Sequence, residues 1–253
     1  MYTVAFANQK GGVGKTTSCV NMAAVCAAAG HRVLLVDCDP QGNSTSGLGV
    51  SKKSVKHSVY DGIIGAKDVP ACVLPTSVEN LSVIPSQIAL AGAEFELMDM
   101  ENRENAMKSF LASADGYDLC FIDCPPSLSL LTVNALNAAQ GILIPMQCEY
   151  YALEGLTQLM LTIRKVKQLY NPTLCILGIL ITMYNSRLNL SVQVLEEIKK
   201  YYADKLFPTP IPRSVKLTEA PSYGVPGVLY DAYNKGSRAY EEAARELMRR
   251  IGL

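Results

Sequence analysis

The sequence predicts an α/β fold with three layers, in which helices cover both faces of a mostly parallel, twisted sheet. Short apolar runs alternate with helical patterns along nearly all of the 253 residues, as in proteins built from strand–helix–strand units. The apolar runs are largely continuous, which is typical of strands buried on both faces. The length and the 49% content of hydrophobic residues agree with a single domain over residues 1–253.

The first part of the chain contains short apolar runs, separated by one alanine-rich stretch and one polar, glycine-dotted stretch. The last two of these runs each end at a proline. In chain order, these predict a strand at 2–7, a helix at 18–29 that begins near Lys15, a strand at 32–36, a short helix at 59–64, and strands at 71–74 and 81–84.

The rest of the chain continues the alternation. The predicted order is a helix at 94–114, a strand at 117–122, a helix at 128–139, a strand at 141–145, a helix at 153–170, a strand at 174–182, a helix at 190–202, a helical turn at 216–220 and a helix at 236–250. The helix at 94–114 places apolar side chains mostly on one face, which is typical of core packing. These side chains are Phe95, Met98, Met107, Phe110 and Leu111.

A glycine-rich loop at 8–17 joins the first strand to the first helix, which is the context of a phosphate-binding loop. Its glycines can adopt backbone conformations closed to other residues, so that several N–H groups point into one concavity. The following helix adds the partial positive charge of its N-terminus. Lys15 can then reach the β- and γ-phosphates, and the Thr16 hydroxyl can ligate Mg²⁺. The predicted nucleotide-binding residues here are Gly11, Gly12, Val13, Gly14, Lys15, Thr16 and Thr17.

Three carboxylates come directly after buried strands. Asp37 and Asp39 follow the strand at 32–36, and Asp123 follows the strand at 117–122. Since ligands of open α/β sheets bind at the carboxyl ends of the strands, these side chains are expected beside the loop. Asp123 suits a water-mediated contact to Mg²⁺, and Asp37 is predicted to be structural.

The loop departs from the common pattern G-x-x-x-x-G-K-[ST], because Gln9 stands at the first glycine position and a second lysine, Lys10, follows it. The segments VDCDPQGN at 36–43, FIDCPPS at 121–127 and QCEYYALEGL at 147–156 accompany this loop. With them, the sequence resembles the deviant Walker A ATPases, and among these the ParA/Soj chromosome- and plasmid-partitioning proteins. The resemblance runs over nearly the whole chain.

The resemblance implies an ATPase with ATP and Mg²⁺ as cofactors. Lys10 is expected to reach the phosphates of a partner across a nucleotide-sandwich homodimer, and Asp39 to orient the attacking water. The implied catalytic residues are therefore Lys10, Lys15 and Asp39, with Mg²⁺ held by Thr16 and, through water, by Asp39 and Asp123. Asn185 and the segment Pro212-Arg213 are expected to flank the adenine.

The charge distribution points to a basic surface in the second part of the chain. The formal net charge is zero, but residues 1–150 carry nine Lys and Arg against fourteen Asp and Glu, and residues 151–253 carry the reverse. The DNA-binding candidates are Arg187, Lys199, Lys200, Arg213, Lys216, Lys235 and Arg238. The resemblance favours Arg187, Arg213 and Lys216, and it implies non-specific duplex DNA and a ParB/Spo0J-like protein as partners.

Three alternative functions remain open. A MinD-like membrane-cycling ATPase would need a membrane-binding amphipathic tail, whereas the alanine-rich, partly acidic C-terminal helix suits packing on the domain. A nitrogenase-reductase-like protein would need paired cysteine ligands, and the eight cysteines are scattered. A cargo-positioning ATPase would share all of the chemistry. With no apolar run of about 18 residues, the protein is expected in the cytoplasm and not at a membrane. The resemblance, through its DNA partner, implies association with the nucleoid.

Overall fold

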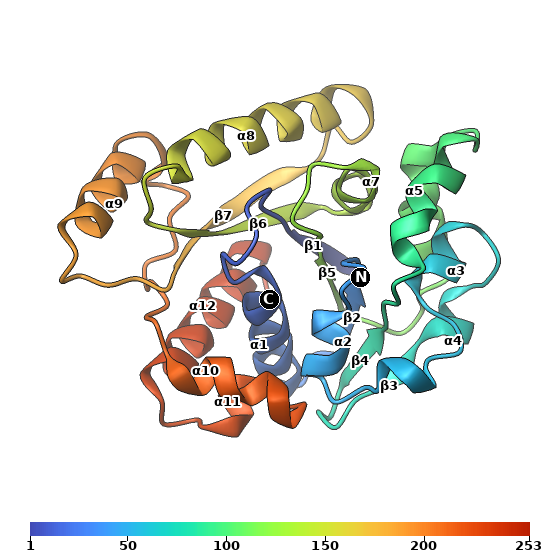
Figure 1. Ribbon diagram of the computed structural model, residues 1–253, viewed down its shortest axis with the longest axis horizontal. Coiled ribbons are helices and arrows are strands. Elements are labelled where there is room, and N and C mark those ends of the chain that lie inside the picture. The colour runs from blue at the N-terminus through green and yellow to red at the C-terminus, as the bar shows by residue number, and fades with distance from the viewer.

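A seven-stranded sheet runs through the middle of the computed structural model, which describes residues 1–253 (Figure 1). The strand order is β3-β4-β2-β5-β1-β6-β7, and only the β3–β4 pair is antiparallel. The strands are β1 (Tyr2–Phe6), β2 (Val33–Asp37), β3 (Leu74–Pro75), β4 (Leu81–Ile84), β5 (Leu119–Asp123), β6 (Gly141–Gln147) and β7 (Cys175–Thr182). The predicted α/β class with a mostly parallel sheet is confirmed.

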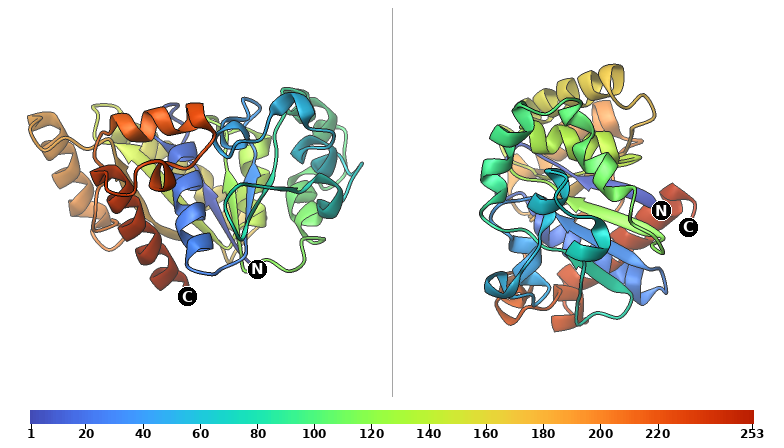
Figure 2. Two further views of the ribbon diagram at one scale, coloured as in Figure 1. Left: turned by 90° about the horizontal axis from the view of Figure 1, so that it is seen from below. Right: turned by 90° about the vertical axis from the view of Figure 1, so that its right-hand side faces the viewer.

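Helices cover both faces of the sheet (Figures 1 and 2). One face carries α1 (Lys15–Ala28), α10 (Val215–Glu219), α11 (Gly227–Tyr230) and α12 (Lys235–Ile251). The other carries α3 (Val59–Ile63), α4 (Val69–Cys72), α5 (Leu90–Met98), α6 (Ala106–Leu111), α7 (Leu130–Ala138), α8 (Ala152–Leu169) and α9 (Asn189–Tyr202). The remaining elements are α2 (Asn43–Gly47) and 3-10 turns at Lys52–Ser54, Arg103–Asn105 and Ala220–Tyr223.

Two hydrophobic clusters fill the space between the sheet and its helices, one on each face. Successive side chains of a strand point to opposite faces, so β1 sends Val4 and Phe6 into one cluster and Ala5 into the other. Phe6 packs on Phe121 of β5 with ring centroids 5.1 Å apart. Because the central strands are buried on both faces, their sequences read as continuous apolar runs.

The structure corrects two predicted elements. The single helix at 94–114 is two helices, α5 and α6, interrupted where Asn102 adopts a left-handed conformation with φ of 55°. The strand at 71–74 is instead helix α4, whose first turn is capped by the Asp68 carboxylate, followed by the short strand β3. Two of the predicted core side chains are also exposed, since Phe95 and Met98 are 72% and 52% accessible. No helix has the length and apolarity needed to span a membrane.

Candidate nucleotide-binding site

The glycine-rich loop connects β1 to α1 and has the backbone shape of a phosphate cradle. Gly12 and Gly14 have φ of 73° and 82°, a left-handed conformation that costs glycine little and other residues much more. Gly14 is the N-cap of α1, so the unpaired N–H groups of the first helical turn face the loop. An anion placed here would meet these N–H groups and the positive end of the helix dipole.

Beside the loop lies a cavity of about 510 Å³. Most of the predicted nucleotide-binding residues line it, while Val13 is buried and borders a different cavity. The predicted residues on its wall are Gly11, Gly12, Gly14, Lys15, Thr16, Thr17, Asp39, Pro212 and Arg213. Asn185 does not line this cavity. It lines an adjacent hollow together with Pro212 and Arg213, which also line the cavity. The two segments predicted to flank the adenine therefore lie side by side, and their contact with the base stays a prediction.

The two lysines of the loop point in different directions. Lys15 is 6% exposed, and its ammonium donates to the carbonyl oxygen of Lys10 at 3.1 Å. Burial lowers the pKa of Lys15, and the nearby Asp123, Cys124 and Asp39 oppose this effect. The buried cation therefore lacks a close anionic partner, and a bound phosphate would supply one.

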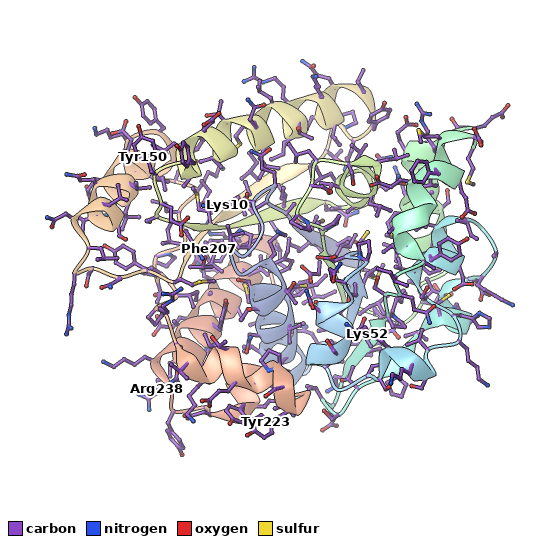
Figure 3. The ribbon with its side chains drawn as sticks, viewed as in Figure 1. Lys10, Lys52, Tyr150, Phe207, Tyr223 and Arg238 are labelled. Atoms are coloured by element: carbon purple, nitrogen blue, oxygen red, sulfur yellow. The ribbon has the colours of Figure 1, made fainter.

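Lys10 lies on the outer side of the loop, near the centre of the view in Figure 3. Its side chain is 40% exposed and forms an ion pair with Glu149, after β6. It lines a different cavity, of about 490 Å³, together with Tyr151 and Glu154. In the single chain, Lys10 is thus directed away from the nucleotide cavity.

The three carboxylates meet at the carboxyl ends of neighbouring strands. Asp37 of β2 lies opposite Asp123 of β5 in the strand register, and both are fully buried. Asp37 accepts hydrogen bonds from the backbone N–H and the hydroxyl of Thr45, each at 2.7 Å. These bonds agree with the structural role predicted for Asp37. Asp39 is 8% exposed and accepts from the Gln41 N–H at 2.9 Å.

Asp123 is only half satisfied. One carboxylate oxygen accepts from the Ser44 hydroxyl at 2.7 Å, whereas the other, Oδ1, is buried without a hydrogen-bond partner. Burial raises the pKa of Asp123 to about 6. The Ser44 and Thr16 hydroxyls and the Lys15 ammonium lower this pKa, but their effect is smaller. A buried carboxylate oxygen without a partner costs free energy unless water or a cation occupies the site.

These residues fit a Mg²⁺ ion that is bound together with a nucleotide. Mg²⁺ keeps several of its waters and binds through one or two protein oxygens plus phosphates. Thr16 lines the cavity, and its hydroxyl acts on the Asp123 carboxyl, whose pKa it lowers. No group of three or more His, Cys, Asp or Glu side chains could enclose an ion by itself, so the phosphates would complete the coordination.

Comparisons with known proteins agree with this geometry. A family model described as an AAA domain matches residues 1–176. The sporulation initiation inhibitor protein Soj of Bacillus subtilis (strain 168) is 54% identical over 245 residues, which are 96% of this chain and 97% of that protein. The chromosome partitioning protein ParA of Myxococcus xanthus (strain DK1622) is 48% identical over 248 residues, with coverages of 98% and 88%. This chain belongs to the ParA/Soj family.

Solved structures extend the comparison to ligands. A protein described as cobyrinic acid a,c-diamide synthase from Mycobacterium smegmatis, solved with ADP and magnesium, has a TM-score of 0.88 and 39% identity, and covers 100% of this chain and 96% of that one. A second structure of it holds an ATP analogue and magnesium. The cofactors predicted for this ParA/Soj family member, ATP and Mg²⁺, agree with these two structures.

Several polar residues that shape the site were not predicted. Thr182, at the end of β7, donates its hydroxyl to the carbonyl oxygen of Val13 at 2.7 Å, and the Gln147 amide donates to that of Gly12 at 2.9 Å. These bonds attach the loop to β6 and β7. In a similar way, the Ser44 hydroxyl donates to the Asp123 carboxylate and the Thr45 hydroxyl donates to the Asp37 carboxylate. A polar residue where an apolar strand ends is the signal that would have pointed to Thr182.

The basic residues predicted to contact DNA divide into two groups in this ParA/Soj family member. Arg187, Lys235 and Arg238 line one hollow of about 450 Å³ beside α12, together with Asn185 and Glu242; we call it the basic hollow, and Arg238 projects from that side of the molecule in Figure 3. Arg213 lines the adjacent hollow that Arg187 also reaches. None of these four forms an ion pair. The remaining candidates, Lys199, Lys200 and Lys216, are each paired with a glutamate one helical turn away.

Proposed function

We propose that the protein is a partitioning ATPase that dimerises with ATP and then binds duplex DNA without sequence preference. A ParB-like partner would stimulate its weak hydrolysis and so release the DNA. The observation that carries the proposal is the opposed direction of the two loop lysines, with Lys15 buried at the nucleotide cavity and Lys10 facing outward. Lys15 would bind the nucleotide of its own chain, and Lys10 would be free to bind the nucleotide of a second subunit.

The chemistry needs little beyond positioned charge, because phosphoryl transfer to water is catalysed mainly by electrostatic stabilisation. The loop N–H groups and Lys15 would hold the phosphates. Bound Mg²⁺ would neutralise charge on the β- and γ-phosphate oxygens, with Thr16 and, through water, Asp123 and Asp39 holding it. Asp39 lines the cavity and would also hold the attacking water and accept its proton.

Dimerisation follows from the position of Lys10. Its ion pair with Glu149 is half exposed and is therefore worth little in water. Reaching a partner's γ-phosphate would replace that weak pair with a charge-assisted contact to a multiply charged anion. Such a contact exists only while the γ-phosphate is present, so hydrolysis would dissolve the dimer.

DNA binding is proposed for the basic hollow and Arg213. Exposed cations without ion pairs can neutralise phosphates, which gives salt-dependent binding without sequence preference. One such hollow can neutralise only a few DNA phosphates, whereas a dimer would present two hollows and neutralise about twice as many. Coupling DNA affinity to ATP therefore needs no rearrangement within the chain. We propose association with the nucleoid on the same grounds.

Three other functions are less well supported. The apolar face of α12, which includes Tyr240 and Leu247, is buried against the sheet, and this does not favour the use of that helix for MinD-like membrane cycling. A diamide synthase activity is suggested only by the description of one structural relative at 39% identity, whereas partitioning relatives reach 54%. A cargo-positioning ATPase would use the same ATP chemistry and would position a cargo other than a chromosome or plasmid.

The test measures sedimentation and binding to non-specific duplex DNA across a salt series, with ATP, ADP or no nucleotide. We expect a dimer and steeply salt-dependent DNA binding with ATP alone. Lys10→Ala should bind ATP but stay monomeric and bind DNA weakly. A Lys10→Ala protein that dimerises and hydrolyses ATP like the parent would refute the assignment of Lys10, and an ATP dimer that ignores DNA would favour the cargo or membrane alternatives.

A further inference from the structure

Helix α5 is apolar on two opposite sides. Its inward side packs in the core, and the buried residues are Leu90, Ala93 and Leu97. At roughly 100° per residue, Phe95 lies on the opposite side of the helix and is 72% exposed. Met98, at the end of α5, lies on the same side as Phe95 and is 52% exposed. Ile88, two residues before the helix begins, is on that side too and is 72% exposed. We call these three side chains the α5 ridge.

The segment that carries the α5 ridge is acidic, and the next basic side chain along the chain, Arg103, donates to the Met98 carbonyl oxygen and pairs with Glu104. Residues 87–101 contain four carboxylates and no lysine or arginine. These carboxylates are Glu94, Glu96, Asp99 and Glu101. An exposed aromatic and a methionine on one helix face, bordered by negative charge, are complementary to a helix with apolar side chains and basic flanks. Contiguous exposed apolar side chains of this kind mark interaction sites more often than scattered ones do.

The segment before the α5 ridge is bonded to the carboxylate pair of the nucleotide site. Ser86 is fully buried two residues before Ile88, and its N–H donates to the hydroxyl oxygen of Thr45 at 2.9 Å. The same hydroxyl donates to Asp37 at 2.7 Å. A displacement at the start of α5 would therefore reach α2 and the segment that carries Asp39.

A second link leaves the middle of α5. The Glu94 carboxylate accepts from the N–H of Leu131, in the first turn of α7, at 3.4 Å. The loop before α7 starts at Asp123, and its Pro126 lines the nucleotide cavity. Two segments that line the nucleotide cavity are thus connected to the helix that carries the ridge.

We propose that the α5 ridge is the docking surface for a basic amphipathic segment of the partner that stimulates ATP hydrolysis. The inference rests on the proposed function, because it assumes a stimulating partner. In Figure 1, α5 and α9 lie at opposite ends of the molecule, and the basic hollow lies on the α9 side. A partner on the ridge would therefore leave the proposed DNA surface uncovered and could act on the DNA-bound protein.

The test uses the purified ParB-like protein of the same source as the probe, together with Phe95→Ser. Phe95 is mostly exposed, so its loss should leave folding, basal ATP hydrolysis, the ATP dimer and DNA binding unchanged. We expect the partner concentration for half-maximal stimulation to rise about tenfold or more, as for the loss of a central aromatic anchor. Leu169→Ser, at the end of α8 and 68% exposed, is the control and should leave that concentration unchanged. Asp99→Lys should weaken stimulation most at low salt.

Photo-crosslinking separates this inference from the proposed function. With p-benzoylphenylalanine in place of Phe95, the partner should be cross-linked, and with the same group in place of Leu169 it should not. A stimulating partner that fails to cross-link at position 95, or that stimulates Phe95→Ser like the parent, overturns the docking site. Cross-linking at 95 without stimulation supports the docking site and contradicts only the proposed activation. If Phe95→Ser abolishes the ATP dimer in the absence of partner, the ridge is a self-interface and the inference is wrong.

Discussion

Lys15 and the carboxylates beside the nucleotide cavity are buried and hydrogen-bonded, whereas the cations of the basic hollow are exposed and unpaired. At the cavity, Lys15, Asp37 and Asp123 are buried, and neighbouring backbone and hydroxyl groups hold them in place. At the hollow, Arg187, Lys235 and Arg238 are exposed and form no ion pair. The first arrangement fixes the position of charge in a weakly screened environment, whereas the second leaves cations mobile and hydrated.

This difference predicts different consequences of mutation. Buried charges contribute much to catalysis because they are positioned before the reaction, and their removal leaves unpaired neighbours. Exposed cations each contribute a small, salt-dependent share to binding. Changes at the cavity should therefore alter turnover and folding stability, and changes at the hollow should alter only DNA affinity.

The largest effect is expected from Lys15→Ala. Loss of the buried ammonium should lower ATP turnover by about 10³-fold or more and weaken nucleotide binding, measured by single-turnover hydrolysis and fluorescent-nucleotide titration. Lys10→Ala removes the same charge from the same loop and is the matched control, since it should keep nucleotide binding. Equal nucleotide affinity in the two variants would contradict the separate roles of the two lysines.

The cavity was largely predictable from the sequence, because its chemistry is local. One loop supplies the glycines, Lys15 and Thr16, and strand ends supply the carboxylates. Thr182 and Gln147 escaped prediction because they contact the loop from strands more than 130 positions away in sequence. Asn185 was placed at the adenine by resemblance. It lines the adjacent hollow beside Pro212 and Arg213, and its contact with the base stays a prediction.

The prediction of a single long helix at 94–114 was wrong for a physical reason. Its apolar spacing is helical throughout, but the left-handed Asn102 breaks it, and Phe95 points away from the core. Periodicity alone cannot tell an apolar face that packs inward from one that meets solvent. The basic hollow was also only partly predicted, because three separate segments form it and charge counts do not show which lysines pair with glutamates.

A second prediction concerns the pH dependence of folding stability without nucleotide or Mg²⁺. Burial, with a smaller effect of Asp123, raises the pKa of Asp37 from 3.8 to about 7, against its hydrogen bonds with Thr45 and the Asp39 N–H. The native state therefore holds a proton that the unfolded chain has released, so the free energy of unfolding should fall as pH rises from about 4 to 7. Each pKa unit corresponds to about 1.4 kcal/mol.

Urea denaturation at a series of pH values, in EDTA, measures this effect. Asp37→Asn keeps the size of the side chain and removes the titration, so its free energy of unfolding should depend less on pH over the same range. Arg187→Ala, at the basic hollow, should retain the parental pH dependence. A parental dependence in Asp37→Asn would mean that Asp37 does not titrate in this range.

The smallest effect is expected from Arg187→Glu at the basic hollow. Reversal of one exposed cation should lower the affinity for non-specific duplex DNA by about tenfold at low salt and reduce the salt slope by about one phosphate contact. ATP turnover and dimerisation should stay as in the parent, because Arg187 does not line the nucleotide cavity. Lys199→Glu makes the same change of charge at a lysine already paired with Glu196 and should have a weaker effect. An unchanged salt slope in Arg187→Glu would remove Arg187 from the DNA surface, and a loss of turnover would show that the hollow and the cavity are not independent.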